Sequence, residues 1–143
     1  MPPAYFLAAI VCMILLHFLL PIRFFLRVPL TLLGLLPLAA GVVLNLLADR
    51  WFKKMETTVK PFRDASTLIT GGPYRLSRHP MYLGMSLCLL GVWLLLGSVS
   101  PAIPFLLFPV VIEALFIPTE EADMERLFGE AYRQYKGTTR RWI

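Results

Sequence analysis

Charged residues are scarce in this chain of 143 residues. Asp, Glu, Lys and Arg make up 16% of it, whereas hydrophobic residues make up 57%. Soluble domains have roughly a quarter of their residues charged. The mean hydropathy is +0.68, and the apolar residues lie in long runs. The composition therefore argues against an ordinary water-soluble domain and indicates a chain surrounded by lipid.

Cysteine and histidine are also scarce, with two of each. Cys12 and Cys88 lie inside apolar runs, and His17 and His79 have no partner at ligand spacing, so the pattern excludes a metal site. The chain lacks a phosphate-binding P-loop and a dinucleotide-binding glycine fingerprint. Its basic residues are not interleaved with aromatic ones at repeated spacing, so no nucleic-acid partner is expected.

Four apolar segments cover residues 4–22, 28–48, 81–97 and 102–117. A membrane-spanning helix needs about 20 residues, so the first two segments are long enough alone and the third when its polar start is included. The fourth is short, but an uncharged turn joins it to the third as a helical hairpin. The sequence predicts an all-α, polytopic membrane bundle of about four spanning helices, forming a single domain over 1–143, with a C-terminal amphipathic helix.

Positive charge is distributed unevenly among the connections. Residues 49–80 carry seven Lys or Arg and the tail 118–143 carries five, whereas the first connection has only Arg23 and Arg27 and the third has none. Because cytoplasmic loops are enriched in Lys and Arg, the long connection and the tail are expected in the cytoplasm, with both termini on that face. The net charge of +5 also suggests contact with anionic membrane lipids.

A polar cluster precedes the third apolar segment, in the order Gly71-Gly72-Pro73-Tyr74-Arg75-Leu76-Ser77-Arg78-His79-Pro80-Met81-Tyr82-Leu83-Gly84. Proline is favoured at the first position of a helix, so His79 is expected at its N-cap, with Tyr82 on the same face. The free N–H groups of a helix start and the neighbouring cations suit a carboxylate or a phosphate. Gly84 allows a ligand or another helix to approach. The alternative is a basic anchor to lipid headgroups.

A second cluster, Glu120-Glu121, follows the fourth apolar segment, and apolar residues at helical spacing continue from it to Tyr135. The two carboxylates suit a cation or sugar hydroxyls, or they simply cap a helix start. Since both clusters end helices of one hairpin, Arg78-His79 is expected to pair with Glu120-Glu121.

Glu113 is an ionisable residue inside the fourth apolar segment, which makes it a functional candidate. The alternative is a neutral Glu113 that is hydrogen-bonded to Asn45 or His17. His17 itself is expected to form an interhelical hydrogen bond rather than to act in catalysis.

The two clusters together resemble the isoprenylcysteine carboxyl methyltransferase and phospholipid methyltransferase superfamily. The resemblance rests on Gly72-Pro73-Tyr74-Arg75, on Arg78-His79-Pro80-Met81-Tyr82-Leu83-Gly84, on Glu120-Glu121 and on Phe128-Gly129-Glu130 with Tyr132 and Tyr135. It covers residues 68–137, about half of the chain. It implies an integral-membrane enzyme that takes S-adenosylmethionine at the cytoplasmic face and a lipid-like methyl acceptor from the bilayer.

Residue roles follow from that resemblance. It implies that the cofactor pocket includes Tyr74, Arg75, His79, Pro80, Tyr82 and Gly84, and that Glu120 and Glu121 hold the cofactor's ammonium or ribose hydroxyls. It associates Arg78 most closely with the transfer. The residues themselves agree with this chemistry, because the two tyrosine rings suit a sulfonium through cation–π attraction.

The acceptor decides which other groups are needed. A prenylcysteine carboxylate would be oriented by Arg78 or Arg75 and needs no base, whereas an ethanolamine headgroup needs a general base such as Glu113, Glu120 or Glu121. The closer similarity is to the isoprenylcysteine enzymes. Phospholipid N-methylation is the alternative, followed by a sterol-reductase-like enzyme and a non-enzymatic membrane scaffold.

Overall fold

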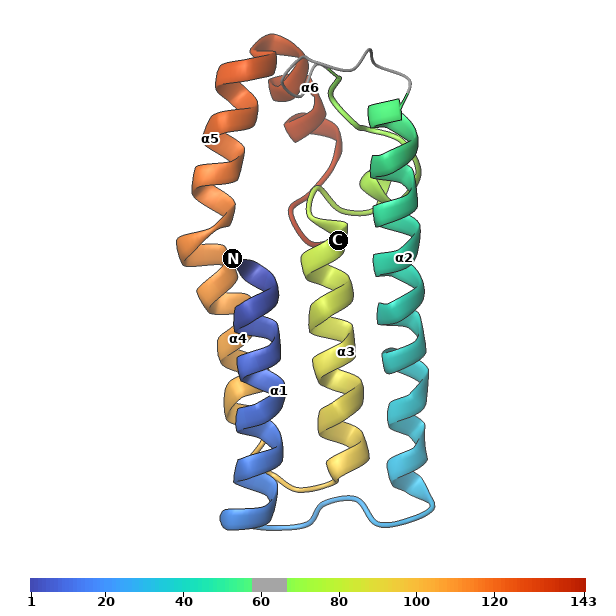
Figure 1. Cartoon of the computed structure of the whole chain (residues 1–143), viewed down its shortest axis with the longest axis vertical. Coiled ribbons are helices and arrows are strands. Elements are labelled where there is room, and N and C mark those ends of the chain that lie inside the picture. The colour runs from blue at the N-terminus through green and yellow to red at the C-terminus, as the bar shows by residue number, and fades with distance from the viewer. Residues whose placement is uncertain (58–66) are drawn as a thin grey trace.

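The computed structural model of the chain describes residues 1–57 and 67–143, which form a bundle of helices (Figure 1). This described part contains no strand, only an isolated bridge between Phe24 and Ser98. In chain order its elements are α1 (Pro2–Leu19), the 3₁₀ helix η1 (Leu30–Gly34), α2 (Leu35–Thr57), the 3₁₀ helix η2 (Gly72–Arg75), α3 (Pro80–Leu96), α4 (Ala102–Leu115), α5 (Ile117–Phe128) and α6 (Glu130–Thr138).

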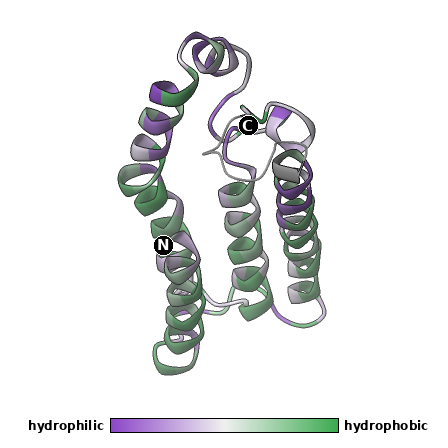
Figure 2. Cartoon of the chain, turned by 45° about the horizontal axis from the view of Figure 1, so that its top comes forward, coloured by the Kyte–Doolittle hydropathy of each residue, from purple (hydrophilic) through white to green (hydrophobic). Residues whose placement is uncertain are grey.

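Among the described residues, three helical stretches are long and apolar enough to cross a membrane: Pro2–Leu19, Leu30–Met55 and Ala102–Phe128. The fourth apolar helix, α3, has 17 residues and is shorter than these. Apolar residues cover the length of the bundle, whereas polar residues gather at one end (Figure 2). The protein is therefore an integral membrane protein, as the composition predicted.

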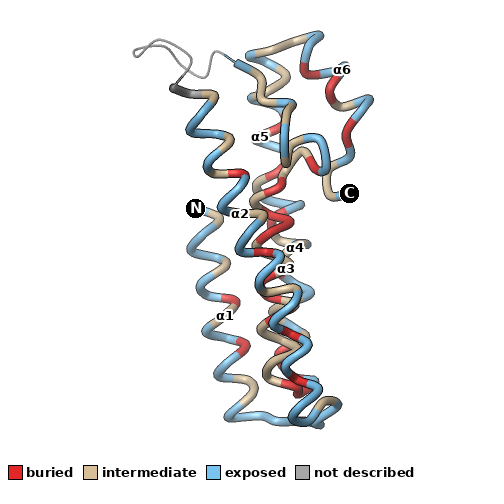
Figure 3. Tube along the Cα trace, turned by 90° about the vertical axis from the view of Figure 1, so that its right-hand side faces the viewer, coloured by how far each residue is buried: buried red, intermediate tan, exposed pale blue. Residues whose placement is uncertain are grey.

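Helix α3 is the centre of the bundle, since it packs against α1, α2, η1 and α4. Buried residues follow the inward faces of the helices, while the outward faces are exposed and apolar (Figure 3). The fully buried core includes Met13 of α1, Leu89 of α3 and Ile112 of α4. The start of α3 and the helices α5 and α6 lie at the same end of the bundle (Figure 1), which brings the two polar clusters together.

Glycines allow α2 and α3 to approach until backbone meets backbone. A Cβ atom placed on Gly41 of α2 would lie 2.5 Å from the carbonyl oxygen of Gly84 on α3. A Cβ atom on Gly91 would lie 2.6 Å from the backbone nitrogen of Leu38. Small residues at such contacts are typical of membrane helices, where close packing replaces the hydrophobic effect as the source of attraction.

Helix boundaries differ from the expected segments for local reasons. Helix α2 runs to Thr57, beyond the expected end at residue 48, and Lys53 and Asp49 form an i,i+4 ion pair of 2.8 Å on this polar extension. Helices α4 and α5 meet at Phe116, ahead of Pro118. The amphipathic stretch expected to continue to Tyr135 is two helices, because Gly129 has a φ of 53° and ends α5.

Polar groups at the other end of the bundle fasten the loops to one another. His17 of α1 lies 2.7 Å from the hydroxyl of Ser98, in the turn between α3 and α4. Trp93 donates to the Ser98 carbonyl, and Ser100 donates to the carbonyl of Leu20. The expectation that His17 is a structural hydrogen-bonding residue is consistent with this contact.

Candidate functional site

The start of α3 is built as its sequence predicts. His79 is the N-cap residue and Pro80 follows at the first helical position. The buried hydroxyl of Ser77 accepts a hydrogen bond from the backbone N–H of His79 at 3.1 Å. Pro80 has no N–H that needs an acceptor at this position, and the Ser77 hydroxyl accepts the N–H of His79. The helix start is therefore fixed without the His79 ring, which remains available for other contacts.

The glycine turn before this helix rests on Trp51 of α2. Gly72 has a φ of 58°, which favours glycine, and a Cβ atom there would lie 2.7 Å from the indole ring. The turn leads into η2, where the Tyr74 carbonyl accepts a hydrogen bond from the Tyr135 hydroxyl at 2.5 Å. Helix α6 is thereby connected to the segment that precedes α3.

An inner cluster of three side chains, His79, Tyr82 and Glu120, connects α3 to α5. The His79 and Tyr82 rings are stacked, with centroids 5.6 Å apart and planes 10° from parallel. The Tyr82 hydroxyl donates a hydrogen bond to Glu120, and His79 Nδ1 lies 3.5 Å from Glu120 Oε2. The pairing of the two sequence clusters, which was expected from the hairpin, is thus confirmed.

An outer cluster lies beside it and contains Arg78, Glu121, Arg141, Glu113 and Trp142. Arg78 Nη2 lies 2.9 Å from Glu121 Oε1, and both side chains are less than a tenth exposed. Arg141 contacts both carboxylate oxygens of Glu121, Nε to Oε1 at 3.1 Å and Nη2 to Oε2 at 2.8 Å. Arg141 and the Trp142 indole also donate to Glu113, at 3.3 and 3.1 Å.

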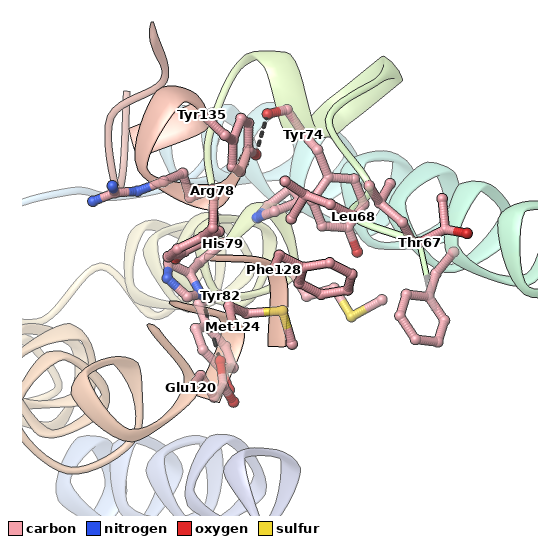
Figure 4. A pocket seen from close by; sticks show the side chains of 15 residues that line it. Thr67, Leu68, Tyr74, Arg78, His79, Tyr82, Glu120, Met124, Phe128 and Tyr135 are labelled. Carbon is pink, nitrogen blue, oxygen red and sulfur yellow. Dashed lines mark hydrogen bonds and ion pairs between the residues drawn. The ribbon is translucent and has the colours of Figure 1, made fainter. Parts of the chain in front are cut away.

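A cavity of about 280 Å³ lies at this end of the bundle. Figure 4 shows the His79, Tyr82 and Glu120 side chains on one side of it and Met124, Phe128 and Leu68 on another, whereas the guanidinium of Arg78 points away from that apolar side. The cavity therefore has a charged side and an apolar side. Its lining residues are Phe52, Thr67, Leu68, Ile69, Tyr74, Arg78, His79, Pro80, Met81, Tyr82, Glu120, Met124, Phe128, Tyr132 and Tyr135.

The candidate residues from the sequence divide into two groups. Those that line the cavity are Tyr74, Arg78, His79, Pro80, Tyr82 and Glu120. Four others do not line it. Arg75 is exposed, Glu121 is buried in the outer cluster, Gly84 faces the Asn45 side chain, and Glu113 is bound by the tail. Of the two uses expected for Gly84, the structure shows the approach of a helix.

The suggested hydrogen bond from Glu113 to Asn45 or His17 is wrong. Glu113 contacts Arg141 and Trp142 instead, His17 contacts Ser98, and Asn45 packs on Gly84. The physical reason is that the tail turns back onto α4 and brings a guanidinium within reach of this carboxylate.

Several residues of the site were missed by the sequence reasoning. Arg141 and Trp142 lie in the tail, where no periodic pattern indicates a contact partner. Tyr132 and Tyr135 were noted only as part of a motif, yet both are buried and line the cavity. Aromatic residues three apart on the buried face of an amphipathic helix were a signal that could have identified them.

Two buried polar atoms remain without a hydrogen-bond partner in the part of the site that the structure describes: Arg78 Nε and His79 Nε2. Glu121 Oε1, at 3.6 Å, is too far from His79 Nε2 for a hydrogen bond. Buried polar atoms of this kind are costly unless something binds them. Arg78 Nε, which is always a donor, suits an anionic group, just as Glu120 suits a cationic one.

Burial also shifts the titration of two tyrosines that lie outside the apolar helices. Desolvation, and then the charge of Asp49, raises the pKa of Tyr74 to about 12. Desolvation, and then the charge of Glu121, raises the pKa of Tyr132 to about 12. In an unfolded chain both would titrate near 10.

We therefore expect stability to fall as the pH rises from about 10 to about 12. A raised folded-state pKa means that the folded protein keeps these protons while the unfolded chain releases them, so the stabilisation is complete below pH 10 and is lost above 12. Thermal unfolding at a series of pH values measures the stability, and tyrosinate absorbance measures the ionisation of the tyrosines. Tyr74→Phe should have a shallower decline than the wild type, and equal declines would contradict the assignment for Tyr74.

Comparison with known proteins places this helical membrane fold and its polar site in a family. The family model described as phospholipid methyltransferase matches residues 30–131. The chain belongs to that phospholipid methyltransferase family, which confirms the resemblance drawn from the two motifs. The match begins at η1 and ends inside α6, so it contains α3 and Glu120-Glu121 together with α2.

Individual relatives match over shorter stretches. A protein-S-isoprenylcysteine O-methyltransferase of Schizosaccharomyces pombe is 40% identical over 72 residues, which are 48% of this chain and 29% of that protein. A probable protein-S-isoprenylcysteine O-methyltransferase of Oryza sativa is 34% identical over 74 residues, 52% of this chain and 39% of that protein. An uncharacterized protein of Haemophilus influenzae is 40% identical over 63 residues, 44% of this chain and the whole of that protein. No solved structure matches the chain.

Proposed function

We propose that this protein transfers a methyl group from S-adenosylmethionine to a lipid-like acceptor, and that the acceptor is the carboxylate of a prenylated cysteine. The observation that carries the proposal is the cavity with a charged side, formed by His79, Tyr82 and Glu120, and an apolar side, formed by Met124 and Phe128. A charged donor and a lipid acceptor need these two environments side by side.

The residues of the site match the charged groups of S-adenosylmethionine, the methyl donor. Glu120 would hold its ammonium or ribose hydroxyls, as a carboxylate at a low-dielectric boundary attracts a cation strongly. Arg78 Nε is a buried donor that suits its carboxylate, and the Tyr74 and Tyr82 rings suit a sulfonium. When bound, S-adenosylmethionine supplies an electrophilic methyl group. The chain's own contribution is to align the two reactants and exclude water, which lowers the barrier without a proton transfer.

The choice of acceptor follows from the contacts of the three candidate bases, Glu113, Glu120 and Glu121. An amine acceptor has to lose a proton to a base. Glu121 is bound by two guanidinium groups, and Glu113 is bound outside the cavity by Arg141 and Trp142. Among the described lining residues only Glu120 is acidic, and it already accepts a hydrogen bond from Tyr82. A carboxylate acceptor needs no base, so this arrangement favours carboxyl methylation over methylation of an ethanolamine headgroup.

Family membership and the site also favour a methyltransferase over the sterol-reductase-like and scaffold alternatives. We further propose that residues 1–143 act as a single domain and that the site end faces the cytoplasm. The described parts of the two Lys- and Arg-rich segments, residues 49–57 and 67–80 and the tail, lie at this end of the bundle (Figure 1).

The test combines binding and turnover on protein reconstituted in lipid. Calorimetry should show S-adenosylhomocysteine binding to the wild type. With labelled S-adenosylmethionine, an S-farnesylcysteine with a free carboxylate should become labelled, and mild base should release the label as methanol from the ester. Label that resists base and appears in phosphatidylethanolamine vesicles would instead indicate N-methylation. Absence of both binding and transfer in a folded protein would refute the proposal.

A further inference from the structure

We infer that Arg141 is a positioning residue, which acts through Glu121 and Arg78 to set the distance between His79 and Glu120. Arg141 lies in the tail, outside both sequence motifs. The positioning role rests on the proposed function only for the identity of the ligand that the inner cluster binds. The geometry of the cluster does not depend on that ligand.

Glu121 lies between two cations, Arg78 and Arg141. Arg141 contacts both of its carboxylate oxygens, and Arg78 contacts Oε1, so one carboxylate joins the tail to the start of α3. Glu121 is 4% exposed. A guanidinium that takes both oxygens fixes the direction of a carboxylate as well as its charge. Arg141 therefore determines where Glu121 presents Oε1 to Arg78.

The residues of the outer pair are adjacent in the sequence to those of the inner pair. Arg78 precedes His79, and Glu121 follows Glu120. The outer pair at 2.9 Å thus brings the neighbouring residues of α3 and α5 together, and the inner pair lies at 3.5 Å. If the Glu121 carboxylate rotates, residues 78–79 at the start of α3 shift relative to residues 120–121 of α5. The distance between His79 and Glu120 then changes.

The tail is held by its backbone independently of the Arg141 side chain. The Ser77 hydroxyl donates to the Arg141 carbonyl at 2.6 Å, and the Arg78 N–H donates to the Arg140 carbonyl at 3.0 Å. The Tyr135 hydroxyl donates to Tyr74. Removing only the Arg141 side chain should therefore leave the tail in place and change the outer cluster.

Arg140 provides a matched control. It has the same side chain one position earlier, it is exposed, and within residues 1–57 and 67–143 its guanidinium makes no hydrogen bond or ion pair. Arg140→Ala and Arg141→Ala remove the same charge from the same tail. A difference between them reports the contacts of Arg141 and not the net charge.

The experiment exploits the presence of only two histidines in the chain. NMR of ring-labelled histidine in the full-length protein should give one signal set for His17 and one for His79, assigned with His79→Asn. We expect Arg141→Ala to shift the His79 signals and leave those of His17, at the far end of the bundle, unchanged. Arg140→Ala should move neither. Arg141→Lys, which keeps one charge but not the two-oxygen contact, should give an intermediate shift and decides the question if the alanine variant fails to fold.

Turnover of S-farnesylcysteine supplies the second measurement. Arg141→Ala should lower kcat/KM by up to about 100-fold, as expected when reacting groups are misplaced. Arg140→Ala should stay within about twofold of the wild type, because substitutions of exposed residues without such contacts have small effects. In a Glu121→Gln background, removing Arg141 should cost little more, because both act along one route.

Unchanged His79 signals in Arg141→Ala would overturn the positioning role. So would additive losses with Glu121→Gln. A wild type that turns over no acceptor would instead count against the proposed function, and the NMR result would still decide the role of Arg141. The two failures are therefore distinguishable.

Discussion

Replacing Glu120 with alanine is expected to weaken S-adenosylhomocysteine binding by about 10- to 100-fold, because a hydrogen bond to a charged group contributes about 1.5–3 kcal/mol. Glu120 is the one acidic residue among the described residues that line the cavity. It also orders two of the other lining side chains, since Tyr82 donates to it and His79 lies 3.5 Å away. Its removal would take away a ligand contact and release both rings. Calorimetry on lipid-reconstituted protein measures the effect.

Two variants make that result specific. Glu130→Ala removes a carboxylate of α6 that is exposed and pairs with Arg133, so its binding should match the wild type. Tyr82→Phe leaves Glu120 in place and removes one donor to it, so its loss should be smaller than that of Glu120→Ala. Wild-type affinity in a folded Glu120→Ala protein would mean that the donor binds elsewhere.

Much of the inner cluster could be predicted because local rules place it. His79 precedes a proline at a helix start, Tyr82 lies one turn further, and Glu120 follows the second arm of the same hairpin. The uncharged turn at 97–101 brings the two arms together. Each step depends on a short stretch of sequence, so the pairing across the hairpin followed from the order of the motifs.

Of the outer cluster, the pairing of Arg78 with Glu121 was expected, whereas the contacts made by the tail could not be predicted in the same way. These tail contacts join residues 20 to 64 positions apart, for example Glu121 with Arg141 and Ser77 with the Arg141 carbonyl. They depend on Gly129, which ends α5 and turns α6 and the tail back toward α3. A continuous apolar pattern from Met124 to Tyr135 conceals this turn. Consequently, Glu121 was grouped with Glu120 although their surroundings differ.

A close helix approach at Gly84 was one of the two uses expected from the sequence, but Gly41 on the facing helix α2 was not singled out, and it leads to the second large effect. Gly41→Val is expected to destabilise the folded bundle by roughly 3 kcal/mol, at the upper end of the usual cost of overpacking. Even the first atom of the new side chain would lie 2.5 Å from the Gly84 carbonyl and 2.7 Å from the Cys88 nitrogen. Both are backbone atoms, so the helices would have to separate. The free energy of unfolding, measured by SDS titration, tests this.

Gly137→Ala is the matched control for that variant. Nothing lies within 4 Å of a Cβ atom at Gly137, which lies in α6. Since alanine is favoured over glycine in helices by about 1 kcal/mol, this variant should be as stable as the wild type or slightly more stable.

Separation of α2 from α3 should also reach the site, because Phe52 of α2 lines the cavity and Trp51 supports the turn at Gly72. Gly41→Val that still folds should therefore bind S-adenosylhomocysteine more weakly, whereas Gly137→Ala should not. If Gly41→Val lost stability but kept wild-type affinity, the cavity would depend on α3, α5 and α6 alone. The wall contributed by α2 would then be a consequence of packing and no part of the donor site.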